Sequence, residues 1–407
     1  MATTLPISPD GQAIALICSS IALKGGRTLR PLTASEWRKL SHDLHSAKLS
    51  PRDLIGRTEE EIRDALGYSP EGAERLAGLL SRGGQMAIEL EGLANRGIWL
   101  LTRIDEGYPS ALKGRLGAQA PPVLFGAGPK TSLESPGIAV VGSRDVDEDG
   151  LQFSTTLGRR CAEQNFTVVS GGARGVDLAA MSGSVRHGGI AIGVTVEPLE
   201  RLVRKKELRA AIADELLTLV TPFHPAARWH AGNAMRRNRL IYVLSQAAVV
   251  VASSTEKGGT RAGALENLKA NWVPLWVRDD GSAGNRQLLA EGGRRLPPSN
   301  PESLDLRELS EDPRTSLLDL ADGGAAKDPE TDSLYEAAWS ILSPFLREPR
   351  KEEEVAEEFE LERSQARAWL KRAAAEEKLQ VTKRPKRYLV AESSPGQLRI
   401  EDSQLIE

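Results

Sequence analysis

Short apolar runs that alternate with helical segments constrain the fold of this chain more than any other feature. The runs span residues 137–141, 167–170, 190–194, 218–220, 247–252 and 272–277. Between them lie segments of helical length with mixed polar and apolar residues. Strands that alternate with helices predict a mostly parallel sheet with helices on both faces. The expected fold class is therefore α/β.

The sequence on either side of this region predicts further domains. Residues 1–95 carry helical patterns, one of which opens with a capping box of Thr58 and Glu61. The apolar runs 98–101 and 123–125 indicate strands that lead into the sheet. Three helical segments and a two-stranded hairpin near the C-terminus are typical of a winged helix. The expected organisation is a helical domain (1–95), the sheet domain with its lead-in (96–300), a linker (301–330), a winged helix (331–393) and a tail (394–407).

Several classes of protein are disfavoured by composition. No apolar run approaches the roughly 18 residues that a membrane span requires, and the N-terminus lacks the pattern of a secretory signal. The two cysteines, Cys18 and Cys161, lie far apart and suit a reducing cytoplasm. The five histidines form no metal-ligand pattern. We therefore expect a cytoplasmic protein with no membrane span, no disulfide, no metal and no cofactor.

Charge is distributed unevenly along the chain. Residues 137–298 hold 21 Lys and Arg against 16 Asp and Glu, whereas the remaining residues hold 32 against 40. A basic middle between acidic flanks indicates an anionic ligand for the central domain. A chance scatter of surface charge would give the same count and stays open as an alternative.

Three loops that follow predicted strands combine glycine with arginine. They read GSRDVDEDG (142–150), SGGARG (170–175) and EKGGTRAG (256–263). The carboxyl ends of parallel strands meet at one edge of a sheet, where free N–H groups and guanidinium groups bind phosphate. Tight turns alone would explain one such loop, but three favour an anion site. The candidate residues are Gly142, Ser143, Arg144, Gly171, Gly172, Arg174 and Arg261.

A fourth basic element, HAGNAMRRNRLIYVLS, spans residues 230–245 and contributes Arg237, Asn238 and Arg239. No acidic residue interrupts residues 216–255, and a solvated basic face is one explanation of the arginine cluster. The apolar residues of LIYVLS make the helix amphipathic and place it against the sheet before the fifth strand, so the arginines are expected near the ligand edge. The sequence contains neither a G-x-G-x-x-G after the first strand nor a P-loop, which disfavours a dinucleotide site and a P-loop nucleotide site. Asp177 is expected to stabilise a helix dipole. Phe223, Trp229 and Tyr242 are the nearest aromatic side chains that could stack on bases, and a core position is an alternative for Tyr242.

The segments VVGSRDVDEDG, VVSGGARGVDLAA and RRNRLIYVLS, in this order and spacing, resemble the DNA-processing protein A (DprA/Smf) family over about residues 96–280. The resemblance implies a Rossmann-like domain that binds single-stranded DNA, forms a homodimer and passes the strand to a RecA-type recombinase during DNA uptake, without catalysis. The positions that it implies for DNA binding are Gly142, Ser143, Arg144, Gly171, Gly172, Arg174, Arg237, Asn238 and Arg239. The chain departs from the family pattern at Met181 and at Ala252, among other places, which is typical of a divergent member and leaves a role in defence against foreign DNA open.

Two further interpretations remain open. The segment KGGTRAGALE (257–266) loosely resembles phosphoribohydrolases of the lonely-guy type, in which Arg261 and Glu266 would act on a nucleoside monophosphate. The chain could instead be a scaffold whose winged helix docks a partner. For the winged helix itself, the acidic stretch EEEVAEEFELE opposes contact with duplex DNA and favours protein interaction.

Overall fold

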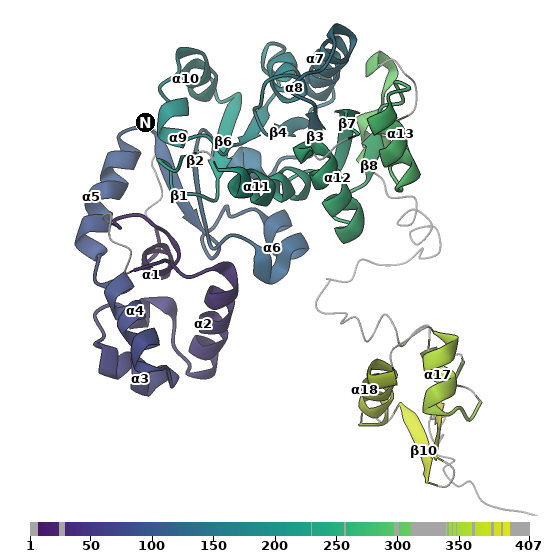
Figure 1. The fold of residues 1–407 in the computed structure, drawn as a ribbon. Helices are drawn as coiled ribbons and strands as arrows, with labels where there is room; N and C mark the ends of the chain where they lie inside the picture. The colour runs from purple at the N-terminus through teal and green to yellow at the C-terminus, as the bar shows by residue number, and fades with distance from the viewer. Residues whose placement is uncertain are drawn as a thin grey trace, which may run out of the picture. The chain divides into compact units, whose positions relative to one another are not determined.

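The computed structural model divides the chain into two compact units, residues 1–320 and residues 321–407 (Figure 1). In the first unit it describes residues 7–23, 29–228, 230–255, 258–296 and 301–310. In the second unit it describes residues 339, 342–343, 345–346, 348–359, 363–375, 378–383 and 386–390.

A nine-stranded sheet organises the first unit, in the order β1-β2-β6-β5-β4-β3-β7-β8-β9. Strands β3 to β9 run parallel to one another, whereas β1 and β2 form an antiparallel pair, and β2 joins the sheet antiparallel to β6. All six predicted apolar runs form strands, so the prediction of an α/β fold with a mostly parallel sheet is confirmed. The strands are β1 (Ile98–Thr102), β2 (Val123–Ala127), β3 (Gly137–Gly142), β4 (Thr167–Ser170), β5 (Ala191–Val194), β6 (Leu217–Thr221), β7 (Ala247–Ala252), β8 (Leu275–Val277) and β9 (Arg294–Arg295).

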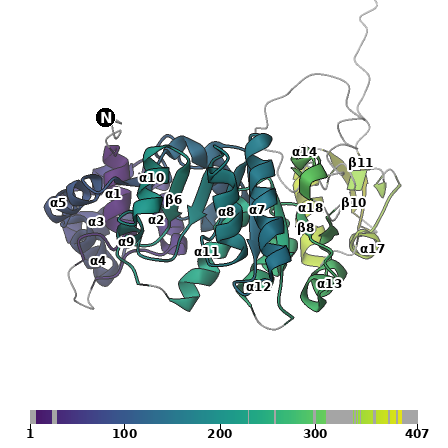
Figure 2. The ribbon, with the colours of Figure 1, turned by 90° about the horizontal axis from the view of Figure 1, so that it is seen from above.

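Helices cover both faces of this sheet because alternate side chains of each central strand are apolar on both sides. In β3, Ile138 and Val140 belong to one buried cluster, and Ala139 and Val141 belong to the other. Helices α7 (Glu148–Glu163) and α8 (Val176–Val185) lie side by side on the first face (Figures 1 and 2). Helices α6 (Ser110–Leu116), α11 (Ala231–Val243), α12 (Gly259–Ala270) and α13 (Ala283–Ala290) contribute to the cluster on the second face.

The strand order reverses direction between β3 and β7. From β3 the chain adds β4, β5 and β6 towards one side, whereas from β7 it adds β8 and β9 towards the other. At such a switch point the loops after adjacent strands diverge and leave a crevice where ligands of α/β proteins bind. The loops after β3, β4 and β7, which carry candidate residues, therefore border this crevice, which is the place in the sheet that is best suited to a ligand.

Within the described residues five α-helices precede the sheet, and they are α1 (Pro9–Cys18), α2 (Ala34–Ser46), α3 (Glu59–Leu66), α4 (Pro70–Leu80) and α5 (Gly83–Ala94). The predicted capping box opens α3, where the Thr58 hydroxyl accepts from Glu61 N and the Glu61 carboxylate accepts from Thr58 N. No pattern in the sequence singles out α1. From Ala13 onwards this helix is apolar on all sides, as expected for a helical segment that is surrounded by protein, and its residues 13–17 are all buried.

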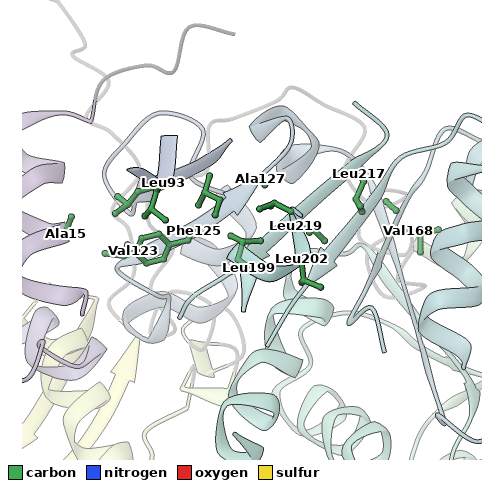
Figure 3. Packing of buried hydrophobic residues seen from close by; sticks show 14 of the residues in the cluster. Ala15, Leu93, Val123, Phe125, Ala127, Val168, Leu199, Leu202, Leu217 and Leu219 are labelled. Carbon is green, nitrogen blue, oxygen red and sulfur yellow. The ribbon is translucent and has the colours of Figure 1, made fainter. Parts of the chain in front are cut away.

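One continuous core joins the N-terminal helices to the sheet. Ala15 of α1 and Leu93 of α5 belong to the same buried cluster as Phe125 of β2 and Leu219 of β6 (Figure 3). Helix α1 packs against β1 and β2. The N-terminal helices therefore complete the apolar cover of the first face over β1, β2 and β6.

The chain beyond β9 first stays with the sheet. Helix α14 (Leu306–Ser310) lies within the expected linker, and its Leu306 and Leu309 are buried. Trp276 of β8 donates its indole N–H to Leu309 O over 2.9 Å. These contacts tie residues 301–310 to the first unit.

The second unit contains α17 (Glu352–Glu358), α18 (Arg363–Ala375) and an antiparallel hairpin of β10 (Leu379–Lys383) and β11 (Lys386–Val390). Leu370 and Tyr388 belong to its own small core. Most of residues 331–347, where the first of three helices is expected, and the tail 394–407 lie outside the described residues. The winged helix therefore stays a prediction. No described helix combines the length and the apolar character that a bilayer crossing requires.

We predict that Ile14→Ala destabilises α1 and the sheet edge together. Ile14 is fully buried, and truncation of such a side chain typically costs about 2–5 kcal/mol because a cavity is left. Hydrogen exchange followed by mass spectrometry should show protection falling by a similar amount in peptides from α1 and from β2.

Gln12→Ala on the exposed side of the same helix serves as the control and should leave both peptides unchanged. If only the N-terminal peptides lost protection in Ile14→Ala, the helices and the sheet would have separate cores.

Candidate functional site

Backbone and side-chain hydrogen bonds connect the loops at the switch point. Ser143 N donates to Ala252 O over 2.9 Å, which ties the loop after β3 to the end of β7. The Thr260 hydroxyl of α12 donates to Gly142 O over 3.0 Å, and Val176 N of α8 donates to Ser143 O over 3.4 Å. The residues of the first two predicted loops are therefore brought together, with the amino ends of α8 and α12 beside them.

Arg237 lies at the centre of this arrangement. Its side chain comes from α11, yet the residue is only 6% exposed, and its guanidinium packs onto the backbone of Gly171. An added methyl group at Gly171 would collide with Nη1 of Arg237. Gly172 has a different requirement, because its φ of +67° lies in the left-handed region and its surroundings are open. The two glycines therefore have different roles: Gly171 lets the Arg237 guanidinium approach the backbone closely, and Gly172 forms a left-handed turn.

Asp177 shares the buried space with Arg237. It is 8% exposed, and its carboxylate accepts from Gly171 N over 3.2 Å and from Ala173 N over 3.4 Å. Burial raises the pKa of Asp177 to about 6, although the Arg237 charge and these N–H donors oppose the rise. Asp177 lies in the first turn of α8 as expected, but its burial beside a cation was not predicted from the sequence.

The Arg237 guanidinium has unused donors. Its Nε and Nη1 are buried and have no hydrogen-bond partner among the residues that the structure describes. Burial lowers the pKa of Arg237, Asp177 raises it, and the nearby positive charge of Arg144 lowers it further. A buried charged donor without a partner costs free energy, and an anionic ligand at this position would supply the missing acceptors.

Exposed arginines surround this centre. Arg144 is exposed at the end of β3, and the Arg174 side chain is 77% exposed and pairs with Asp145 at 2.5 Å. Because both members of that pair are in solvent, the ion pair holds Arg174 only weakly, and a phosphate could replace Asp145. Asn238 donates to Gly259 O over 3.1 Å and thereby connects α11 to the start of α12.

Two predicted arginines are held by other partners. Arg239 donates to the Gln119 side chain over 3.2 Å, and its Nη2 lies 3.2 Å from the Glu266 carboxylate. Arg261 pairs with Glu291 at the end of α13. The guanidinium groups of Arg239 and Arg261 are therefore bound to these side chains, outside the arrangement around Arg237.

The aromatic candidates have different environments. Tyr242 is 1% exposed and belongs to the core, so it is not available for stacking on a base. Phe223 is half-buried, and the Arg236 guanidinium lies 5.9 Å from its ring centroid. Trp229 lies outside the described residues. Among the residues that the structure describes, no group of three or more His, Cys, Asp or Glu side chains could hold a metal ion.

Comparison with known proteins adds to this geometry. The family model for DNA recombination-mediator protein A matches residues 99–303, which is half of the chain. The chain belongs to this family. The matched residues include the whole switch-point site, and the resemblance to the DprA/Smf proteins that the sequence motifs indicate is confirmed.

Individual relatives match a similar portion. A DprA-type protein of Mycobacterium tuberculosis is 31% identical over 225 residues, which cover 51% of this chain and 57% of the relative. Protein Smf of Escherichia coli K12 is 29% identical, over 47% of this chain and 52% of the relative. The DNA processing protein DprA of Bacillus subtilis is 27% identical, over 49% of this chain and 69% of the relative. The chain thus spans about half the length of the first curated relatives that it matches.

Solved structures match the fold more broadly. DNA processing protein A from Streptococcus pneumoniae superposes with a TM-score of 0.51 and 21% identity, over 69% of this chain and 99% of that chain. At this identity the match establishes the fold alone. A structure of DNA processing protein A from Helicobacter pylori, described for its single-stranded DNA binding mode, has a TM-score of 0.42 and 22% identity, over 55% of this chain and 96% of that chain.

We predict that the affinity of this site for a simple anion rises as the pH falls through about 6, the pKa of Asp177. Protonation removes the negative charge beside Arg237, so the guanidinium acts on the ligand without that competition. Sulfate is a suitable probe because its charge stays constant over this range. Its affinity should be measured by calorimetry from about pH 7.5 to about pH 5.5.

Asp177→Asn keeps the shape of the side chain but cannot ionise. The sulfate affinity of this variant should therefore stay constant over the same pH range. An equal pH dependence in the wild type and in Asp177→Asn would assign the effect to another group.

Proposed function

We propose that this protein binds single-stranded DNA along the switch-point edge of the sheet. The observation that carries the proposal is the buried Arg237 guanidinium, whose Nε and Nη1 lack partners. A phosphate provides several acceptor oxygens and a compensating charge, which is what these donors require. Family membership supports a role in DNA processing and recombination.

The distribution of cations favours a polymer over a single nucleotide. Arg144, Arg174 and Arg237 come from three different elements, and only Arg237 is buried. One nucleotide phosphate would engage the buried guanidinium and leave the exposed arginines in solvent. A strand presents a phosphate at every nucleotide, so its successive phosphates fit a row of arginines without any readout of sequence. The predicted contacts are those of Gly142, Ser143, Arg144, Gly171, Gly172, Arg174, Arg237 and Asn238, with Arg239 and Arg261 as more distant contributors.

In the cell, we infer that the protein protects incoming single strands in the cytoplasm and passes them to a RecA-type recombinase. This role requires binding and release and no turnover. It also suits a homodimer, because two copies would cover a longer stretch of strand. A divergent member that acts in defence against foreign DNA would use the same strand-binding chemistry.

The nucleotide-hydrolase alternative depends on Arg261 and Glu266. Arg261 pairs with Glu291, and Glu266 pairs with Arg239. Both side chains would have to leave these partners before they could act on a nucleoside monophosphate. The structure therefore favours strand binding, and turnover of a nucleoside monophosphate by the purified protein would reverse this preference.

For the second unit we propose protein docking in place of duplex binding. Helix α17 carries Glu352, Glu353 and Glu354 in its first turn, and Glu352 pairs with Arg367 of α18 at 2.7 Å. A carboxylate that neutralises a cation of α18 weakens the attraction of that helix for phosphate.

We predict that Arg144→Ala and Arg174→Ala each weaken single-strand binding and each reduce its salt dependence. A phosphate contact on a single strand contributes about 0.7 to the slope of log affinity against log salt, so each variant should lose about that amount. Fluorescence anisotropy with a labelled oligothymidylate at several salt concentrations measures both quantities. Arg237→Ala should lose more affinity, because the lost contact is desolvated.

Arg186 provides the matched control. It is also exposed, but it follows the carboxyl end of α8 at the opposite edge of the sheet. Arg186→Ala should keep both the affinity and the salt slope. The proposal fails if the wild type binds no single strand, or if the variants at the switch point behave like Arg186→Ala.

A further inference from the structure

Two adjoining cavities lie between the N-terminal segments and strand β2 together with the loop after β6. They have volumes of about 270 Å³ and about 140 Å³, and they share Cys18, Val123, Pro222 and Phe223 in their walls. We refer to the two together as the side groove. Its walls come from α1, from the loop before β2, from the loop after β6 and from α11. None of the described residues that line it is acidic.

The floor of the side groove is aromatic and apolar. Phe223 lines both cavities, and Pro121, Pro122 and Pro222 contribute further flat apolar surface. His224 lines the larger cavity and lies 6.4 Å from Phe125, measured between ring centroids. Burial lowers the pKa of His224 below its usual value of about 6.5, although the charges of Glu89 and Glu200 oppose the shift, so this ring is neutral near pH 7. A planar, neutral ring system such as a nucleobase is compatible with these walls.

Basic side chains lie along one wall. Asn233, Arg236, Arg239 and Leu240 line the side groove from α11, and their spacing of three or four residues places them on one stripe of the helix. Arg236 stacks near Phe223 and has no acidic partner among the described residues. Arg239 is partly neutralised by Glu266, but its Nε is buried without a partner. The charge of this wall therefore favours an anionic occupant.

The same helix connects the side groove to the switch-point site. Arg237 projects from α11 to Gly171, whereas Arg236 and Arg239, its neighbours in sequence, line the side groove. Adjacent residues of an α-helix point about 100° apart and are separated by about 1.5 Å along the axis. Only α11 therefore separates the two sites, and a strand bound at Arg237 can reach Phe223 by following the basic surface of this helix.

We propose that the side groove is a second subsite for the same single strand, in which a nucleobase stacks on Phe223 while Arg236 and Arg239 contact the adjoining phosphates. The larger cavity lies just below the roughly 300 Å³ at which pockets for whole small molecules begin, so it suits one base better than a complete nucleotide. The subsite rests on the proposed function, because the strand enters it from the switch-point site. An acidic peptide is the competing occupant, but it offers no planar ring for Phe223.

Strand length separates the two sites experimentally. A short oligothymidylate of about 5 nucleotides occupies only the switch-point site, whereas one of about 20 nucleotides reaches both, since single-strand sites of this kind span about 4–16 nucleotides. Phe223→Leu keeps an apolar side chain but removes the aromatic ring. It should lower affinity for the long strand about tenfold, which is typical for the loss of one stacked base, and leave affinity for the short strand unchanged.

Three further variants complete the experiment. Phe223→Trp should restore long-strand affinity, because tryptophan also stacks. Arg236→Ala should reduce only the long-strand affinity, and Arg186→Ala should reduce neither. The inference is overturned if the wild type prefers long strands and Phe223→Leu keeps that preference, or if Phe223→Trp fails to restore it, since the ring would then have only a packing role. If the wild type bound neither the short strand nor the long strand, the proposed function itself would be refuted.

Discussion

The reversal of strand order between β3 and β7 is the constraint on which the rest of the structure depends. It directs the loops after these strands to opposite sides and opens the edge at which α8 and α12 begin. Hydrogen bonds from Ser143 and Thr260 then fix the loops to each other. At the same edge Arg237 reaches across from α11 and lies on the backbone of Gly171.

Electrostatics at this edge combine two different environments. Arg237 and Asp177 are desolvated, so each changes the protonation or the binding capacity of the other. Arg144 and Arg174 are exposed to water and salt, where their attraction for phosphate is strongly screened. The buried cation therefore binds one phosphate strongly, and the exposed cations bind further phosphates along the strand weakly.

Much of this architecture could be predicted from the sequence, because it depends on local patterns. The six apolar runs, the capping box of Thr58 and the loops that hold Gly142 and Gly171 follow from periodicity and spacing. Helix α1 was missed because a helix that is apolar on all sides has no amphipathic period to detect. The burial of Asp177 beside Arg237 was also missed, since it depends on tertiary packing between α8 and α11. The partners of Arg239 and Arg261 are long-range in the same way, and no spacing in the sequence points to Gln119 or Glu291.

The shared core of α1, β2 and β6 has a consequence for recognition. Val123 and Phe125 belong to the buried cluster that contains α1, and they also line the cavities beside Phe223. The opposing walls are therefore parts of one packed interior, and their separation is set before any ligand arrives. Preorganisation of this kind places most of the entropic cost of association on the flexible partner. A rigid groove of this kind suits a protein that binds any strand and later releases it. The affinity at each position then depends on how much conformational freedom the strand loses, more than on rearrangement of the protein.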